Sequence, residues 1–123
     1  LPIYEITPED LSRIPLVLRE RGSGTLDVFE RALSEHNMKL SSLNVLLYLG
    51  STESIKLFLE HTDCIGIVSI RSISRELLSG TFRVIEIKGM PMLREFCFAQ
   101  PQGQESGLSQ VLMQFAMHHN KKL

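Results

Sequence analysis

Apolar residues recur along this chain in short runs. Amphipathic segments lie between these runs, and turn residues stand at the boundaries. The stretch Ile14–Leu18 is almost unbroken in its apolar character, and Cys64–Ile70 is dense in β-branched residues. Runs of this length between turn residues are typical of buried strands. The predicted strands are Leu16–Arg19, Asn44–Leu49, Cys64–Ile70, Phe82–Lys88 and Leu93–Ala99.

Segments with helical spacing of their apolar residues alternate with these runs. Thr7, followed by Pro8 and two acidic residues, is typical of the start of a brief helix. Strands that alternate with helices predict an α/β fold, with a mainly parallel sheet inside a three-layer sandwich. The predicted helices are the brief one after Thr7, one from the loop near Gly24 to about His36, one after Ser51, one at Ser72–Ser79 that Gly80 ends, and a last one around Leu108–Phe115.

The segment after the first strand has the composition of a binding loop. Arg21–Thr25 reads Arg-Gly-Ser-Gly-Thr and joins the strand to a helix. In such a unit, backbone N–H groups at the positive end of the helix point beyond the sheet edge. We expect a small carboxylate or similar anion to accept hydrogen bonds there from the backbone, Ser23 and Thr25, with Arg19 or Arg21 adding charge. The alternative is structural: a hydroxyl caps the helix and the glycines make the turn.

A second polar turn follows the second strand, where Gly50 precedes Ser51 and Thr52. Open α/β sheets bind ligands beyond the carboxyl ends of their strands, so Ser51, Thr52 and the in-strand Gly66 are candidates for the same crevice. Ser51 equally suits a helix cap, and Gly66 equally suits close packing. The candidate effector-binding residues are Arg21, Gly22, Ser23, Gly24, Thr25, Ser51, Thr52 and Gly66.

Composition narrows the class of protein. The 123 residues suffice for one domain with a core, and a net charge of −1 gives no basic stripe with which to grip nucleic acid. Cys64 and Cys97 lie in predicted strands, which favours buried, reduced thiols and a cytoplasmic setting. No apolar stretch approaches the roughly 20 residues of a membrane span, and no signal peptide is recognisable. A start at Leu1 suggests a piece of a longer protein.

Enzyme motifs are weak in this sequence. Gly22–Gly24 lacks the spacing of a nucleophile elbow, and neither a dinucleotide loop nor a P-loop is complete. His61 and Cys64 are three residues apart, but a buried strand thiol near a surface histidine is more frequent than a catalytic pair. His118 and His119 are adjacent and diverge around a helix, which suits a metal poorly. We predict no catalysis, no metal and no cofactor.

Four segments follow one another in an order that is itself informative: IPLVLRERGSGTLDVFERAL, GSTESIKLFLEHTDCIGIVSI, SRELLSGTFRVIEI and MLREFCFAQPQGQESGLSQVLMQFAMHH. Together they cover most of the chain and resemble the effector-binding domain of LysR-type transcriptional regulators, in its second lobe and the return to the first. Two positions depart from the family pattern. Cys64 replaces the first glycine of Gly-x-Gly-Ile, and Arg71 stands where a proline often closes the strand.

The resemblance implies one lobe of a type II periplasmic-binding-protein-like fold. Residues 1–91 are then the second lobe, and residues 92–123 are a return strand and C-terminal helix that belong to the hinge and the first lobe. It also implies an anionic small-molecule effector in an interlobe cleft, with Ser23 and Thr25 facing it. The parent protein is expected to be a homo-oligomer that reaches nucleic acid only through an absent N-terminal domain.

The expected function is therefore effector sensing within a bacterial, cytoplasmic transcription factor, without membrane contact. Two alternatives stay open. One is an independent solute-binding α/β domain. The other is a small α/β hydrolase, which requires a catalytic pair within hydrogen-bond reach.

Overall fold

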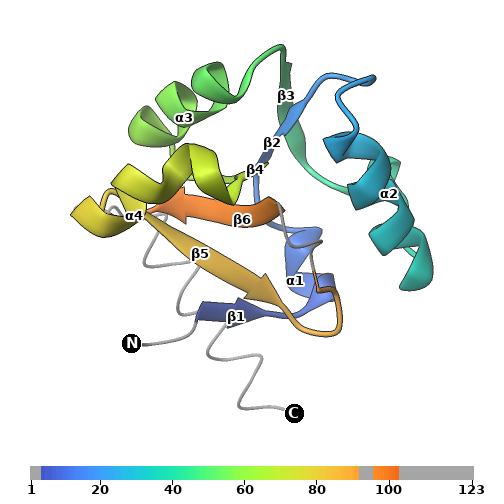
Figure 1. Cartoon of the computed structure of the whole chain (residues 1–123). Helices are drawn as coiled ribbons and strands as arrows, with labels where there is room; N and C mark the ends of the chain where they lie inside the picture. Colours follow the sequence, from blue (N-terminus) through green and yellow to red (C-terminus); the bar gives the residue numbers. More distant parts are fainter. Residues whose placement is uncertain (1–3, 92–95, 103–123) are drawn as a thin grey trace.

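The computed structural model describes residues 4–91 and 96–102, which form a six-stranded sheet in the order β1-β5-β6-β4-β2-β3. Figure 1 shows this sheet with helices on either side of it. The strands are β1 (Tyr4–Ile6), β2 (Leu16–Arg19), β3 (Val45–Leu49), β4 (Ile65–Ser69), β5 (Phe82–Ile87) and β6 (Phe96–Pro101). The helices are α1 (Pro8–Leu11), α2 (Thr25–Glu35), α3 (Thr52–His61) and α4 (Ser74–Ser79), with 3₁₀ turns η1 (Leu40–Ser42) and η2 (Ile70–Ile73).

The sheet is mainly parallel, as predicted. β2 pairs in parallel with β3 and β4, β1 pairs in parallel with β5, and only β6 runs antiparallel to its neighbours. Alternate residues of β2 point to opposite faces, so that Leu16 and Leu18 join one apolar cluster and Val17 joins another. The sheet is therefore the middle layer of three.

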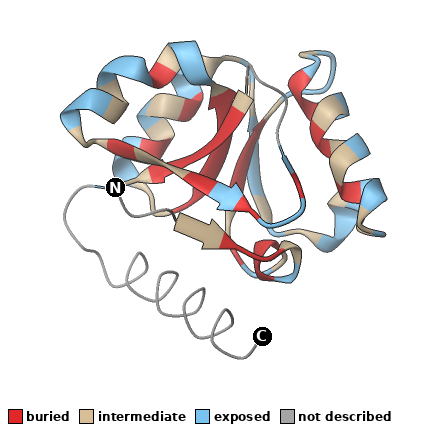
Figure 2. Ribbon diagram, turned by 60° about the horizontal axis from the view of Figure 1, so that its bottom comes forward, coloured by how far each residue is buried: buried red, intermediate tan, exposed pale blue. Residues whose placement is uncertain are grey.

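Each apolar cluster is closed by helices. Residues of α1 and α2, among them Leu11 and Phe29, cover one face, while Ile55 and Leu59 of α3 and Ile73 of η2 cover the other. Figure 1 shows α3 and α4 together on one side of the sheet. In Figure 2 the buried residues concentrate on the strands and on the inward sides of the helices.

Strand β6 lies inside the sheet, where Cys97 pairs with Val68 of β4 and Ala99 pairs with Val84 of β5. The division into a second lobe at residues 1–91 and a return segment at residues 92–123 stays a prediction. The strand also extends to Pro101 rather than ending at Ala99. The predicted last helix and the strand start at Leu93 lie outside the described residues.

Local sequence signals set several element ends. The side chain of Thr7 accepts a hydrogen bond from the Asp10 backbone N–H at 3.1 Å, and the Asp10 carboxylate accepts one from the Thr7 N–H at 3.0 Å. This capping box begins α1 as predicted. Gly80 adopts a left-handed conformation with φ of 78° and ends α4, also as predicted.

Strand β3 lies at an edge of the sheet. Leu46, Leu47 and Tyr48 are 42%, 41% and 46% exposed, although their sequence is as apolar as that of the central strands. An apolar run identifies a strand but does not say whether the strand has neighbours on both sides.

Candidate functional site

The carboxyl ends of β2 and β3 form a topological switch point. The chain leaves β2 toward α2 on one face of the sheet and leaves the neighbouring β3 toward α3 on the opposite face. Segments that diverge in this way open a crevice at the sheet edge, which is where open α/β sheets bind ligands. The structure thus brings the two predicted polar turns to neighbouring strand ends.

The loop before α2 is shaped by its glycines. Gly22 and Gly24 have φ of 100° and 85°, values that side-chain-bearing residues rarely adopt. Gly24 is the N-cap of α2 and offers no side-chain hydrogen bond, so neither Ser23 nor Thr25 is the cap. The Ser23 Oγ atom is buried without a hydrogen-bond partner among the described residues. Thr25 is the first residue of α2 and is 6% exposed.

Arg21 is already paired. Its Nη1 donates to Glu30 Oε1 of α2 at 2.8 Å, and its side chain is 67% exposed. Both residues line a surface groove beside α2 that also includes Ser34 and Tyr48. The carboxylate of Glu30 therefore pairs with the charge of Arg21 at the exposed surface of this helix.

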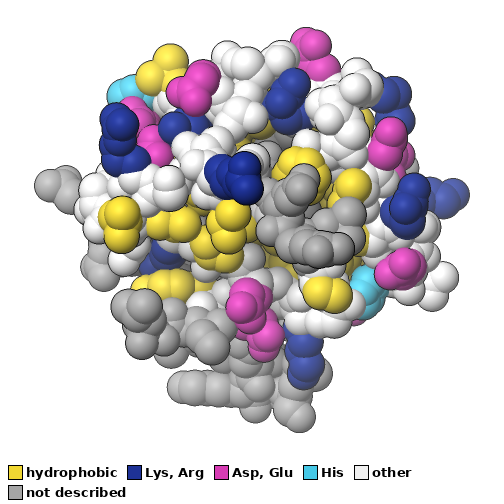
Figure 3. Space-filling view, in the orientation of Figure 1, with side chains coloured by type: hydrophobic (Ala, Val, Ile, Leu, Met, Phe, Trp, Pro, Cys, Tyr) yellow, Lys and Arg dark blue, Asp and Glu magenta, His cyan; other side chains and the backbone are white. Residues whose placement is uncertain are grey.

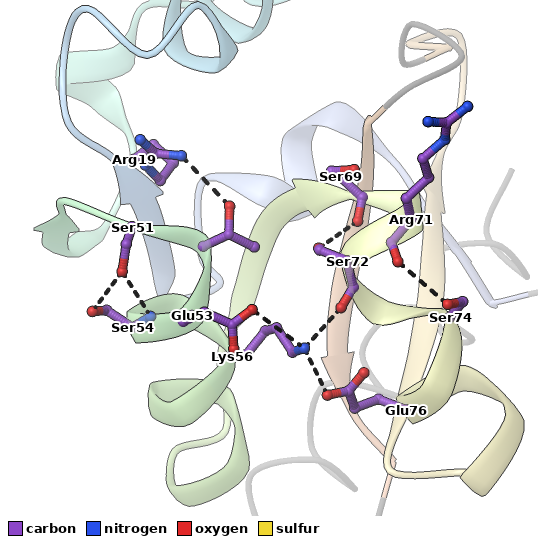
Figure 4. Close-up of polar contacts among 11 residues, drawn as sticks. Arg19, Ser51, Glu53, Ser54, Lys56, Ser69, Arg71, Ser72, Ser74 and Glu76 are labelled. Carbon is purple, nitrogen blue, oxygen red and sulfur yellow. Dashed lines mark hydrogen bonds and ion pairs between the residues drawn. The ribbon is translucent and has the colours of Figure 1, made fainter.

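Ser51 and Thr52 take different parts at the start of α3. The Ser51 Oγ accepts from the Ser54 backbone N–H at 3.1 Å, so Ser51 is a helix cap. The Thr52 Oγ1 accepts from Arg19 Nη1 at 3.5 Å, at the outer limit of a hydrogen bond. Figure 4 shows Arg19 reaching from the end of β2 toward the first turn of α3.

Gly66 lies beneath α3. A Cβ atom at this position would stand 2.9 Å from Ile55 Cγ2 and 3.3 Å from Leu59 Cδ1, both in the buried face of the helix. Close packing of α3 on β4 therefore explains this glycine, as the structural alternative proposed. Its backbone sits inside the sheet rather than in the polar turns.

A half-buried ion pair between α3 and α4 was missed in the sequence. Lys56 Nζ of α3 lies 2.9 Å from Glu76 Oε2 of α4 and donates to the Ser72 carbonyl at 2.8 Å (Figure 4). The hydrogen bond to Glu76 raises the pKa of Lys56, and the same bond holds the pKa of Glu76 below its usual value. Glu53 is 3.7 Å from the same ammonium. Only the pairing of Lys56 with Glu53, three residues earlier, was visible as a sequence signal.

The two thiols are unsuited to nucleophilic chemistry. Cys64 and Cys97 are free and buried, and burial raises the pKa of Cys64 to about 12 and that of Cys97 to about 11. Thiols with such pKa values stay protonated near neutral pH. In the part of the chain that the structure describes, no three His, Cys, Asp or Glu side chains gather to hold a metal ion. His118 and His119 lie outside that part.

Charges of both signs are mixed on the one face of the described residues that can be seen in Figure 3. Among the described residues, no helix is long and apolar enough to cross a membrane. A mostly apolar cavity of about 370 Å³ lies away from the switch point, beside Met90 and Phe98, and its lining residues include Glu5 and Glu86.

Comparisons with known proteins show which family this chain resembles. The family model for the LysR substrate binding domain matches residues 4–121. The chain is 33% identical over 91 residues to the HTH-type transcriptional regulator CbbR of Xanthobacter flavus, covering 74% of this chain and 27% of that protein. It is 30% identical over 118 residues to the HTH-type transcriptional activator CmpR of a Synechocystis species, covering 95% and 38%.

A third relative is the RuBisCO operon transcriptional regulator of Acidithiobacillus ferrooxidans, with 30% identity over 100 residues, 81% of this chain and 31% of that protein. The matched region thus spans between about a quarter and two fifths of the length of these curated relatives.

Proposed function

This chain belongs to the LysR substrate-binding domain family, and from that premise we propose that it binds a small anionic metabolite in the crevice beyond β2 and β3. Membership confirms the predicted fold, one lobe of a type II periplasmic-binding-protein-like α/β domain. The relatives are transcriptional regulators, which confirms the prediction that the chain is not an enzyme.

The observation that carries the proposal is the buried Ser23 Oγ, which has no hydrogen-bond partner among the described residues. A buried hydroxyl without a partner costs free energy, and a ligand oxygen removes that cost. The start of α2 at Thr25 and the start of α3 at Thr52 lie after neighbouring strand ends. Both helix N-termini carry positive partial charge, which favours an anion between them.

The crevice supplies one wall of the binding site. In a two-lobed sensor, the effector lies between this wall and a facing lobe, and binding shifts the equilibrium between open and closed arrangements. The proposed parent protein is a cytoplasmic, oligomeric transcriptional regulator whose separate DNA-binding domain reports that shift. Ser23 and Thr25 supply hydroxyl groups, and the loop around Gly22 and Gly24 brings backbone to the ligand without side-chain obstruction.

The test is to replace Ser23 and Thr25 with alanine in that regulator. Each variant loses a hydrogen bond to an anion, so we expect the effector concentration for half-maximal response to rise roughly tenfold or more. DNA binding without effector should be unchanged. The measurement is an effector titration of DNA binding or of reporter expression.

Two control variants make this test specific. Thr25→Ser keeps the hydroxyl and should respond almost as the unmodified protein does. Ser34→Ala removes an exposed hydroxyl that donates to the Arg31 carbonyl on α2, and should have no effect on the response. An unchanged response in both alanine variants, Ser23→Ala and Thr25→Ala, would remove the loop from the site.

A further inference from the structure

We propose that Arg19 selects the charge of the effector by binding its oxyanion group, a carboxylate or a phosphate, and that Arg21 takes no part. This inference rests on the proposed function of the crevice and names the chemistry that the crevice recognises. Sequence reasoning left Arg19 and Arg21 open as the source of charge, and the structure separates them.

Arg19 is the last residue of β2 and points toward the start of α3 (Figure 4). Its side chain makes one hydrogen bond to another described residue, from Nη1 to Thr52 Oγ1 at 3.5 Å. Its Nε atom is buried and has no hydrogen-bond partner there. A guanidinium carries five N–H donors and a permanent charge, and the Arg19 group uses one of these donors in a hydrogen bond to another described residue.

Three other buried polar atoms of the described residues lack a hydrogen bond, and in each case another part of the same side-chain group makes an interaction. Glu76 Oε1 belongs to the carboxylate that Lys56 neutralises, and Arg83 Nε belongs to a guanidinium that stacks 4.0 Å above the Tyr4 ring. The Asp10 carboxylate accepts from the Thr7 N–H through its second oxygen. Arg19 Nε and Ser23 Oγ are the two of these atoms that lie at the carboxyl end of β2 or in the loop directly after it.

The charge of Arg19 is not neutralised within the described residues, where it forms no ion pair. The adjacent Glu20 is exposed, and its carboxylate lies over Gly50, 3.6 Å from the position that a Cβ atom would take there. Arg21 in contrast is bound to Glu30 at 2.8 Å. An oxyanion with two free oxygens matches the parallel N–H groups of a guanidinium, which an ammonium does not reproduce.

The experiment is a titration of the ¹⁵N-labelled chain, observed at the arginine Nε–H resonances by NMR. Inorganic phosphate and acetate are added in separate arms, with sodium chloride at equal ionic strength as the reference. We expect a saturable shift of the Arg19 Nε–H signal in at least one arm and no shift of the Arg21 signal. The arm with the lower dissociation constant identifies the preferred oxyanion.

Variants of the two arginines then show which of them binds the anion. Arg19→Gln should abolish anion binding at the crevice, and Arg19→Lys should weaken it about tenfold because the charge remains but the two-pronged geometry is lost. Arg21→Gln is the matched control and should bind as the unmodified chain does. Thermal unfolding of each variant checks that the fold is retained.

Three outcomes overturn the inference. They are an unmoved Arg19 signal in both arms, an effect of chloride equal to that of the two anions, and undiminished anion binding at the crevice by Arg19→Gln. The third outcome leaves the proposed function intact and rejects only the role of Arg19. Anion-dependent shifts that map away from the carboxyl ends of β2 and β3 would instead reject the proposed function.

Discussion

Replacing Gly66 with alanine is expected to lower the free energy of unfolding by about 2 kcal/mol, the cost of overpacking a dense core. Gly66 lies in β4, between β2 and β6 in the sheet. The new methyl group would meet Ile55 Cγ2 at 2.9 Å. That atom is a branch methyl fixed near the backbone of α3, so relief requires the helix to move away from the sheet.

Chemical denaturation measures this effect, and Gly50→Ala is the matched control. The atoms nearest to a Cβ atom at Gly50 belong to the Glu20 carboxylate and lie at ordinary contact distances of 3.6 to 3.7 Å. The Gly50 variant should therefore unfold within about 0.5 kcal/mol of the unmodified chain. Equal stability of Gly66→Ala and Gly50→Ala would show that α3 does not pack on β4 as described.

Replacing Glu76 with glutamine is expected to lower the free energy of unfolding near neutral pH by about 2 kcal/mol. The substitution leaves the Lys56 ammonium, whose side chain is 14% exposed, without its nearest counter-charge. Glu53→Gln is the control, since Glu53 lies 3.7 Å away and is 81% exposed. Its loss should cost only a few tenths of a kcal/mol.

The effect of Glu76→Gln should also depend on pH in a defined direction. The pKa of Glu76 in the folded chain lies below its ordinary value of 4.5, so the ion pair stabilises the fold fully above pH 4.5. That contribution disappears as the pH falls through the lowered pKa. The pKa of Lys56 is raised above 10.5, so stabilisation is again lost as the pH rises through the raised value. Unfolding at several pH values checks the curve, and a stability difference that persists unchanged to strongly acidic pH would contradict it.

Much of the local structure follows from the sequence. The apolar run Ile14–Leu18, the two loop glycines and the helical spacing of apolar residues after them predict β2, its loop and α2. Ser51 begins α3 and Gly80 ends α4, as their residue types suggest. Signals of this kind act within a few residues, where backbone and side-chain preferences decide the conformation.

The order of the strands could not be read in this way. Nothing in Phe96–Pro101 says that it pairs antiparallel with both β4 and β5, or that β3 is left at an edge. Such pairing depends on contacts between residues far apart in the chain. The same limit applies to the two arginines, because the ion pair between Arg21 and Glu30 joins the loop to a residue further along α2.

The role of the candidate residues in binding stays a prediction, while the structure shows where each of them lies. Ser23, Thr25 and Thr52 lie at the neighbouring ends of β2 and β3 or directly beyond them, whereas Ser51 caps α3 and Gly66 accommodates it. A glycine inside a strand has the same sequence signature whether a ligand or a helix approaches it. Only the packed structure distinguishes the two.

Mapping of small organic anions onto the backbone amide NMR spectrum tests the central claim most directly, since weak binding by a single wall of the site still shifts the nearest signals. A set of small carboxylates and phosphate monoesters is titrated into the chain at constant ionic strength. The account predicts that the largest shifts fall on the amides of Gly22, Ser23, Gly24, Thr25 and Thr52. Largest shifts at the cavity beside Met90 and Phe98, or no shifts with any of these anions, would contradict it.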